Sequence, residues 1–342
     1  MAGDNFDKGW VYVLHFDLPG KKSNFYKIGL TKNPIPLRIA QLQTGNPFKI
    51  SEAHSFESEC IGLLEGHLHK IFVNKRYHGE WFELTPANFR TVKKEGKSFN
   101  DKFSPLAVQL RALDKKESIH KEMPPTANHL KLHKRALEIA EQINELELRR
   151  DISATHLRRL AGNTLGIDGI CEFYSLDIPK PSIKGSDLQK HDLNEWKKWK
   201  KSKWECDAAI KGKPTKNKSH SKLKKELDDL LNKVKPVFDI NTHSNMSKKR
   251  AKSSREYHQK VIDYNQQLGM LKVEMDLIII QFKLDCKRRR GIEGVFKYVR
   301  GEKEAFDKKS FEENKPRKAY DSRWYYSSDP VPKFRVHKAI GY

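Results

Sequence analysis

The sequence predicts an α+β protein in which a small α/β/α domain with a short antiparallel sheet precedes an elongated, mainly α-helical region with coiled-coil character. Residues 8–95 alternate β-rich runs, turn signals and short helical periods. Residues 257–282 instead follow an apolar heptad. The composition, 37% hydrophobic and 32% charged, is more polar than that of a compact globule and favours extended helices and solvated connections.

The first domain is expected over residues 8–95. A turn signal around Pro19-Gly20 separates two β-rich runs and makes them a hairpin. Pro34 and Pro36 precede a helical run, as proline does in a first turn. The expected elements are strands at 11–16, 25–29, 49–56 and 79–84, and helices at 37–42 and from residue 57.

The rest of the chain divides into a polar linker at 96–125, a basic helical region at 126–310 and an irregular tail at 311–342. A helix should begin near Thr126, because apolar residues from Leu132 to Leu146 recur at steps of four and three. The 257–282 heptad is the clearest pattern. It favours a structural coiled coil over a binding groove and leaves room for a homodimer through this helix.

The net charge of +23 indicates a polyanionic partner, nucleic acid first and an anionic membrane surface second. Residues 1–95 have a balance of only +3, with 13 Lys/Arg and 10 Asp/Glu, whereas residues 184–260 have +12, with 22 against 10. Within the second segment, tryptophans alternate with lysines that could stack on bases and neutralise phosphates. An amphipathic helix with its tryptophans sealed against a neighbour explains the pattern equally well. The segment comprises Trp196, Lys197, Lys198, Trp199, Lys200, Lys201, Lys203 and Trp204.

Several protein classes are disfavoured. The four cysteines form no short-spaced pair, which argues against a disulfide framework or a cysteine zinc site. The first ten residues lack the apolar core of a signal peptide, and no apolar run approaches the roughly 20 residues of a membrane span. We therefore expect a cytoplasmic or nucleoid-associated protein that is not secreted.

An ordered set of motifs resembles the GIY-YIG nuclease superfamily, and within it the phage Orf-type DNA-binding branch. The resemblance covers about residues 9–86 and implies a metal-dependent endonuclease that acts on DNA. Two departures are Trp10 in place of the first motif glycine and a longer loop between the motifs. The matching motifs are Val11-Tyr12, Lys27-Ile28-Gly29-Leu30-Thr31, Arg38, Leu42-Gln43-Thr44-Gly45-Asn46-Pro47, Glu65 with Leu68-His69, and Gly79-Glu80-Trp81-Phe82.

The resemblance implies a role for each matching residue. Tyr12 approaches or deprotonates the attacking water, and Lys27 takes the place of the second motif tyrosine. Arg38 holds the scissile phosphate, and Glu65 binds the metal, Mg²⁺ or Mn²⁺. His69 matches a histidine often present in this branch.

Physical chemistry supports these roles independently. A phenol is a poor base unless a nearby ammonium lowers its pKa, so Tyr12 is expected beside Lys27 across the hairpin. Arg38 offers a bidentate fork for phosphate. One carboxylate, Glu65, suits magnesium when water and phosphate oxygens complete the coordination. Arg76 and Glu80 are supporting residues, and Glu80 is expected either to pair with Arg76 or to bind the metal.

Two other functions remain open. In the first, the domain holds DNA but has lost its chemistry. In the second, the protein is a coiled-coil scaffold whose long helices recruit protein partners. A salt titration of nucleic-acid binding would separate the scaffold from the other two, because phosphate-driven binding weakens steeply with salt.

Overall fold

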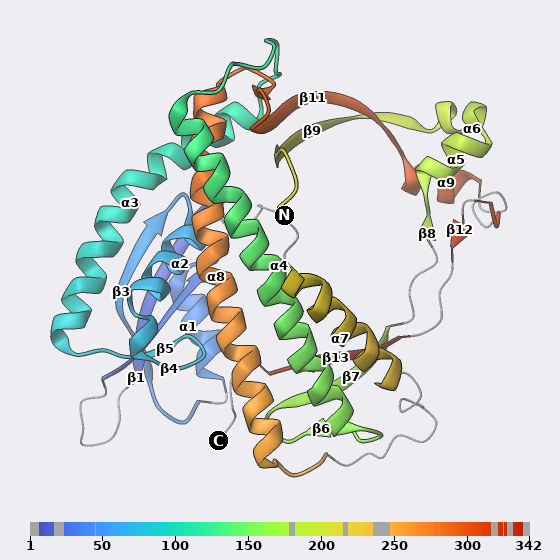
Figure 1. The fold of residues 1–342 in the computed structure, drawn as a ribbon. Helices are drawn as coiled ribbons and strands as arrows, with labels where there is room; N and C mark the ends of the chain where they lie inside the picture. The colour runs from blue at the N-terminus through green and yellow to red at the C-terminus, as the bar shows by residue number, and fades with distance from the viewer. Residues whose placement is uncertain are drawn as a thin grey trace.

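The protein has an N-terminal sheet domain (residues 9–114), a pair of long helices (127–161 and 252–286) and an arch formed by two long paired strands (200–210 and 296–306) (Figure 1). The computed structural model describes residues 7–16, 24–44, 46–177, 182–214, 218–234, 247–315, 321–323, 325–326 and 331–337. In Figure 1 the sheet domain lies beside the long helices, and the arch extends from their upper end toward a small separate lobe.

The N-terminal sheet is antiparallel, with strand order β3-β1-β2-β5-β4. Its strands are β1 (Gly9–Phe16), β2 (Phe25–Thr31), β3 (Ile50–Ser58), β4 (Arg76–His78) and β5 (Trp81–Glu83). The hairpin and the later strands predicted from the sequence are therefore confirmed. Strand β2 lies between β1 and the short β5, which pairs with it only from Phe25 to Lys27.

Helices cover both faces of this sheet. Helix α1 (Ile35–Gln43) packs on one face, where Tyr12, Leu14 and Ile50 are buried. Helix α2 (Ile61–Ile71) packs on the other face against Val11 and Val13. A 3-10 turn, Val73–Lys75, connects α2 to β4. The two faces follow the period-two alternation of β1, so neighbouring residues in one strand serve different layers.

Helix α3 (Pro86–Asp114) corrects the polar linker predicted at 96–125. It begins with a capping box between Thr85 and Asn88 and joins α2 on the same face of the sheet. Phe99, Ala107 and Leu110 are buried at helical spacing. Polar residues between these positions hid the apolar stripe from a composition-based interpretation.

Helices α4 (Ala127–Ala161) and α8 (Lys252–Cys286) run side by side in opposite directions (Figure 1). The helix start predicted near Thr126 is confirmed, with Thr126 as its N-cap. Ala136 and Ile139 of α4 share one buried cluster with Ile278 and Phe282 of α8. The heptad of α8 thus packs within its own chain, and the face expected to serve a homodimer is occupied by α4.

A duplicated unit, missed by our sequence interpretation, begins with these two helices. Each helix has 35 residues and ends in a residue of positive φ, Gly162 or Lys287. The sequence Gly-Ile-(Asp/Glu)-Gly-(Ile/Val) follows at 166–170 and again at 291–295. It makes two equivalent hairpins, and an added Cβ at either first glycine would lie 2.1 Å from a backbone oxygen. Their strands are β6 (Gly166–Ile167) with β7 (Cys171–Asp177), and β10 (Gly291–Ile292) with β11 (Phe296–Phe306).

The two units are also completed in the same way. A third strand joins each hairpin, β13 (Val331–Val336) beside β7 and β9 (Lys200–Ile210) beside β11. His133 of α4 and His258 of α8 each contact the backbone oxygen of the residue after such a strand, Lys211 or His337, at 2.7 Å. The region predicted as mainly helical therefore contains two small sheets as well.

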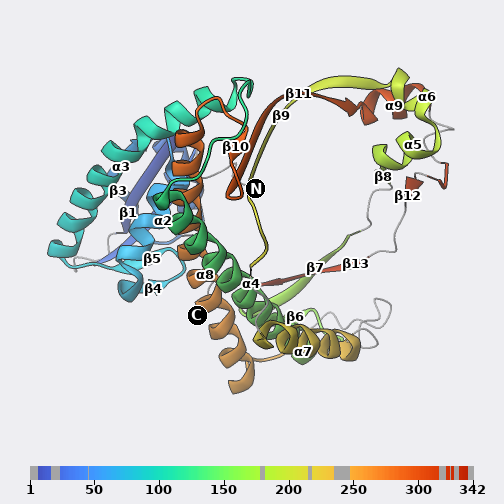
Figure 2. The same ribbon diagram turned by 45° about the horizontal axis from the view of Figure 1, so that its top comes forward.

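The β9–β11 ribbon forms the arch and leads to the lobe (Figure 2). Helix α7 (Lys218–Val234) packs on α4 instead. The expected irregular tail at 311–342 is wrong where the structure describes it, because α9, β12 and β13 fall there. The lobe elements are α5 (Gly185–His191), α6 (Leu193–Lys198), α9 (Lys308–Asn314), β8 (Ser182–Ile183) and β12 (Tyr325–Tyr326). In the described part of the chain, no helix has the length and apolarity that crossing a bilayer requires.

The intrachain seam makes a stability prediction. Ile139→Ala and Ile278→Ala should each lower the free energy of unfolding by about 2–5 kcal/mol, because each leaves a cavity in the α4–α8 core. The urea midpoint should not depend on protein concentration, since neither helix needs a second chain. A midpoint that rises with concentration would instead show that the seam joins two copies.

Candidate active site

The phenol of Tyr12 lies beneath the surface of the sheet. Its side chain is 1% exposed, and it lies opposite Gly29 in the β1–β2 register. A Cβ added at Gly29 would lie 2.6 Å from the Tyr12 hydroxyl oxygen and 2.8 Å from the adjacent ring carbon. Gly29 is therefore needed because the ring of Tyr12 lies directly across β2.

Arg38 of α1 is the cation that reaches Tyr12. Its Nε donates to the Tyr12 hydroxyl at 3.4 Å, and its Nη1 donates to Gln41 at 3.2 Å. Burial nevertheless raises the pKa of Tyr12, because it outweighs the lowering by Arg38, and the charges of Glu80 and Glu65 raise it further. The expectation that a neighbouring ammonium lowers this pKa is therefore wrong. Tyr12 stays protonated at neutral pH and can donate its hydroxyl proton in a hydrogen bond.

Lys27 lies on the same face of the sheet as Tyr12 but forms a different pair. Its ammonium contacts Glu80 at 2.5 Å, just before β5 begins. Arg76, the partner expected for Glu80, donates to the Gly79 carbonyl and lies over the Phe82 ring, 4.8 Å from its centroid. Lys27 and Arg76 thus both fix the turn that carries Glu80.

His69 holds the edge of β2 just beyond its last pair with β5. Its Nε2 lies 2.9 Å from the Ile28 carbonyl oxygen, so this nitrogen carries the proton and donates it. Burial and the nearby Arg76 lower the pKa of His69 to about 4. The imidazole is therefore neutral at physiological pH, and the contact gives it a positioning role rather than that of a proton acceptor at Nε2.

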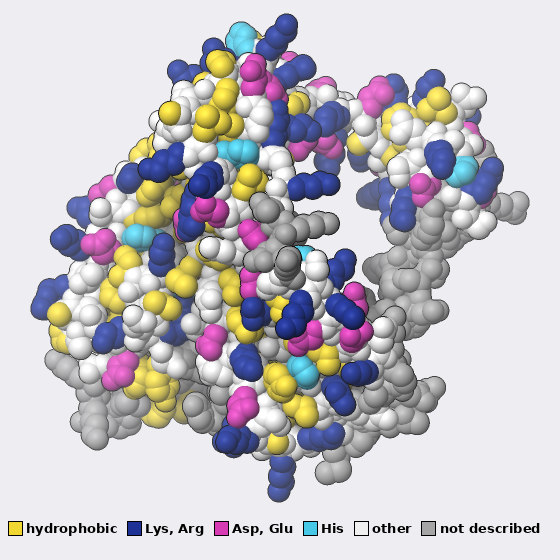
Figure 3. Space-filling model, viewed as in Figure 1, with side chains coloured by type: hydrophobic (Ala, Val, Ile, Leu, Met, Phe, Trp, Pro, Cys, Tyr) yellow, Lys and Arg dark blue, Asp and Glu magenta, His cyan; other side chains and the backbone are white. Residues whose placement is uncertain are grey.

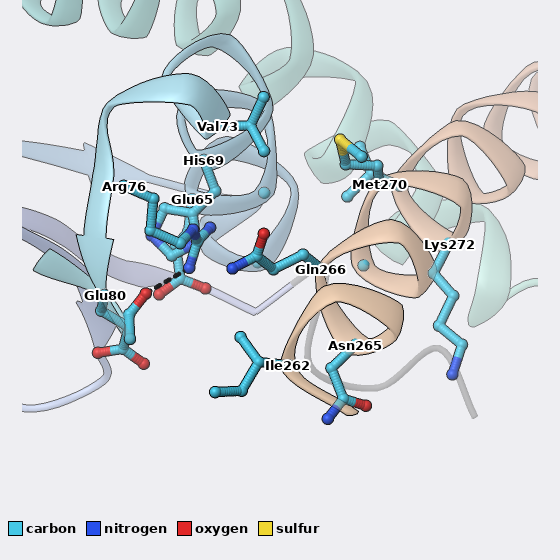
Figure 4. A pocket seen from close by; sticks show the side chains of 15 residues that line it. Glu65, His69, Val73, Arg76, Glu80, Ile262, Asn265, Gln266, Met270 and Lys272 are labelled. Atoms are coloured by element: carbon cyan, nitrogen blue, oxygen red, sulfur yellow. Dashed lines mark hydrogen bonds between the residues drawn. The ribbon is translucent and has the colours of Figure 1, made fainter. Parts of the chain in front are cut away.

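Glu65 lines a cavity of about 580 Å³ between α2 and α8 (Figure 4). His69, Arg76 and Glu80 line the same side of the cavity as Glu65. Arg76 lies close enough for the charges of Glu80 and Glu65 to raise its pKa against the larger lowering by burial. Both carboxylates also raise the pKa of Tyr12, but neither Tyr12 nor Arg38 lines the cavity.

Helix α8 supplies the opposite wall, which the sequence interpretation missed. Ile262, Gln266 and Gly269 line it, and Figure 4 shows the Gln266 amide directed toward Arg76 and Glu65. The heptad accounted for the face of α8 that meets α4. The available signal for its other face was a set of small and polar residues, Asn265, Gln266 and Gly269, between positions of the heptad.

The two walls are in close contact beside the cavity. A Cβ added at Gly66 of α2 would lie 2.5 Å from Cγ2 of Val273, so the helices approach as closely as glycine permits. Ile280 of α8 is buried in the core of the sheet domain, with Leu277 packed against it. Exposing such side chains costs up to about 3 kcal/mol each, so α8 is a fixed wall rather than a loose cover.

The donors at this site fit a hard divalent cation only as an open site. In the part of the chain that the structure describes, no three His, Cys, Asp or Glu side chains converge to hold a metal ion. Glu65 and Glu80 offer carboxylate oxygens on one cavity wall, and magnesium commonly combines one or two carboxylates with water and phosphate oxygens. The residues present therefore fit Mg²⁺ or Mn²⁺ bound together with a phosphate group.

The Trp/Lys segment predicted to bind nucleic acid is largely used inside the protein. Trp196 is 8% exposed and packs with Phe311, so its faces are not available to bases. The indole nitrogens of Trp199 and Trp204 donate to Glu195 at 3.0 Å and to the Asp114 carbonyl at 2.8 Å. The segment is also not one amphipathic helix, because it divides between α6 and β9.

Three lysines of the segment also pair with acids of the arch and lobe. These pairs are Lys198 with Glu195, Lys200 with Glu304 and Lys201 with Asp307. Within the described residues, Lys197 and Lys203 have no ion pair. The segment's charge is therefore partly neutralised where it was expected to meet phosphate.

Comparison with known proteins supports the N-terminal assignment. Residues 9–96 match the T5orf172 domain. This domain is found in phage-type endonuclease-like proteins. The match covers about a quarter of the chain and includes Tyr12, Lys27, Arg38, Glu65 and Glu80, while α8 lies outside it. No curated protein and no solved structure matched the chain.

The T5orf172 match confirms the phage-type resemblance and ends ten residues beyond the expected limit of 86. The wider GIY-YIG relationship remains a prediction. A nuclease or DNA-binding function is plausible for this domain.

A glycine substitution tests the packing beneath the site. Gly29→Ala should lower the free energy of unfolding by about 1–3 kcal/mol, because its Cβ overlaps the Tyr12 ring. Gly269→Ala is the matched control, since its added Cβ meets nothing within 4 Å and alanine favours a helix. Urea unfolding of both variants measures this loss of stability. Equal midpoints for the two variants would contradict the close contact between Gly29 and the Tyr12 ring.

His69 predicts an acid-sensitive contribution to stability. The pKa of His69 falls from 6.5 to about 4 on folding, so the unfolded chain binds the proton more readily. Stability from this group is complete above pH 6.5 and is lost as pH falls toward 4, by about 3 kcal/mol. His69→Gln keeps a donor for Ile28 without this titration. The difference in unfolding free energy between wild type and variant should therefore change across pH 6.5 to 4, and a constant difference would contradict the assignment.

Proposed function

We propose that the protein is a metal-dependent DNA endonuclease that hydrolyses phosphodiester bonds at the Tyr12–Glu65 site. The observation that supports this most directly is the hydrogen bond of Arg38 to Tyr12 in the same domain whose Glu65 lines the cavity. These groups match what phosphodiester cleavage requires: a hydrogen-bonding group for the nucleophile, a cation for phosphate and a carboxylate for a metal.

Each group has a defined task in this proposal. Glu65 would hold a magnesium ion together with the phosphate, and the ion would supply Lewis acidity and lower the pKa of a bound water molecule. Arg38 binds a non-bridging phosphate oxygen and holds the Tyr12 hydroxyl. Protonated Tyr12 orients water or phosphate by donating a hydrogen bond, while Glu65 presents its carboxylate to the cavity. Lys27 fixes Glu80 through their ion pair.

The remaining chain supplies general affinity for the polyanion. The T5orf172 domain accounts for little of the +23 charge. Lys and Arg side chains are spread over the helical half and around the opening beneath the arch (Figure 3). Such a distribution favours sequence-independent phosphate contacts that weaken as salt rises.

Plasmid cleavage with Mg²⁺ or Mn²⁺ tests the proposal. Glu65→Gln should reduce the cleavage rate at least a hundredfold, because the amide cannot replace the carboxylate as a metal ligand. Glu83→Gln on β5 is the matched control, since Glu83 is exposed and does not line the cavity. Wild type that is inert across metals and salt concentrations would contradict the enzyme assignment.

A DNA-binding module without catalysis is the second candidate. The 1% exposure of Tyr12 favours it, because a nucleophile or phosphate must approach a hydroxyl that lies beneath the sheet surface. This alternative predicts salt-sensitive DNA binding that survives both Tyr12→Phe and Glu65→Gln, with no nicking in the same assay.

A further inference from the structure

The cavity at Glu65 has a second wall that belongs to no part of the T5orf172 match. Gln266 and Gly269 stand on α8, some 200 residues after Glu65 in the chain, yet line the same space. The Gln266 side chain is half-buried, and its amide makes no hydrogen bond with the residues that the structure describes. It is directed toward Arg76 and Glu65 across the cavity (Figure 4).

We propose that this cleft receives a single, unpaired nucleic-acid strand and that the Gln266 amide contacts that strand opposite Glu65. The inference rests on the proposed function and adds to it a substrate class and a specificity residue. A glutamine amide both donates and accepts hydrogen bonds, so it can contact a base edge or a phosphate oxygen.

The size of the cleft favours one strand over a duplex. A space of about 580 Å³ accommodates a ligand of nucleotide size, within the range of ordinary small-molecule pockets. The Gly66–Val273 contact leaves no gap between α2 and α8, so the open space is confined to the cavity beside it. A paired duplex is wider than a space of nucleotide size, whereas a single strand with splayed bases can place one nucleotide in it.

The alternative, in which α8 itself enters a groove of duplex DNA, does not fit its packing. A major groove admits a helix whose sides are open. Helix α8 instead packs against α4 along one side and against α2 and α3 along another. Arg135 of α4 also holds Glu274 of α8 through two hydrogen bonds of 2.7 and 3.0 Å. Because α8 is packed on both sides, it can line a cleft that binds a strand but cannot insert into a DNA groove.

The charges in the cleft agree with a phosphate-bearing ligand. Arg76 lies on one wall and Lys272 on the other, where Lys272 is exposed and pairs with Glu147 at 3.2 Å. Glu65 lies on the same wall as Arg76 and is the carboxylate that a cation bound with phosphate would meet, while Lys27 holds Glu80 at 2.5 Å. A strand in this cleft would therefore meet the amide of Gln266 on one side and the metal site on the other.

Binding is measured first, by fluorescence anisotropy of a labelled 15-nucleotide DNA strand and its duplex in EDTA, so that catalysis is not needed. Gln266→Leu should weaken binding of the single strand about tenfold and leave duplex binding unchanged. Gln267→Leu is the matched control, because Gln267 is the next residue, exposed, and absent from the cavity lining. Gly269→Trp should block the strand, since its added Cβ points into open space at the cavity wall.

Cleavage with Mg²⁺ follows on single-stranded, forked and fully paired substrates. Unpaired strands and forks should be cut faster than a continuous duplex. The inference is overturned if Gln266→Leu and Gly269→Trp bind the single strand as wild type does, or if the continuous duplex is cut as fast as the strand. Failure of the proposed function looks different, because no substrate is cut although the single strand still binds through Gln266.

Discussion

Helix α8 is packed on two sides, and the position of the candidate site depends on this double packing. One side meets α4 through Ile278 and Phe282, and another meets the sheet domain through Val273 and Ile280. Gly66 permits the second contact, because any larger side chain would strike Val273. The T5orf172 domain and the helical region are therefore joined through apolar burial rather than by a linker. The cavity at Glu65 exists because α8 passes over α2 at this point.

The chemistry of the site follows from burial as much as from charge. Tyr12 lies against Gly29 and α1, where desolvation favours the neutral phenol even with Arg38 at 3.4 Å. The same effect keeps His69 neutral and available to fix the β2 edge. Each cation near the site is therefore held by a partner within the domain. Arg38 donates to the Tyr12 hydroxyl, and Lys27 pairs with Glu80. Arg76 donates to the carbonyl of Gly79, in the turn that carries Glu80. Glu65 lines the cavity beside these residues.

Much of the sheet domain was predictable, because its signals are local. The alternation in β1, the prolines at the start of α1 and the apolar stripe of α2 each determine one element within a dozen residues. The ordered motifs also pointed to Arg38 and Tyr12, which are in contact in the structure. The partner of Lys27 was missed because it depends on the β2–β5 register, in which Lys27 faces Trp81 and lies beside Glu80. The strand character of β9 was hidden by its lysines, of which Lys200 pairs across the ribbon with Glu304 of β11.

The second wall of the cavity could not have been predicted from local patterns, and the duplicated unit explains why. Two equal helices, each completed by a hairpin and a third strand, form a frame in which His133 and His258 make the same contact. The frame fixes α8 from the α4 side and accounts for the heptad. The frame does not determine what packs on the outer face of each helix. Helix α7 packs on α4, whereas the sheet domain packs on α8. Equivalent helices thus acquired different neighbours, and Gln266 faces Glu65 only because the sheet domain packs on α8. The cavity that Glu65 lines is therefore completed by a part of the chain outside the T5orf172 match.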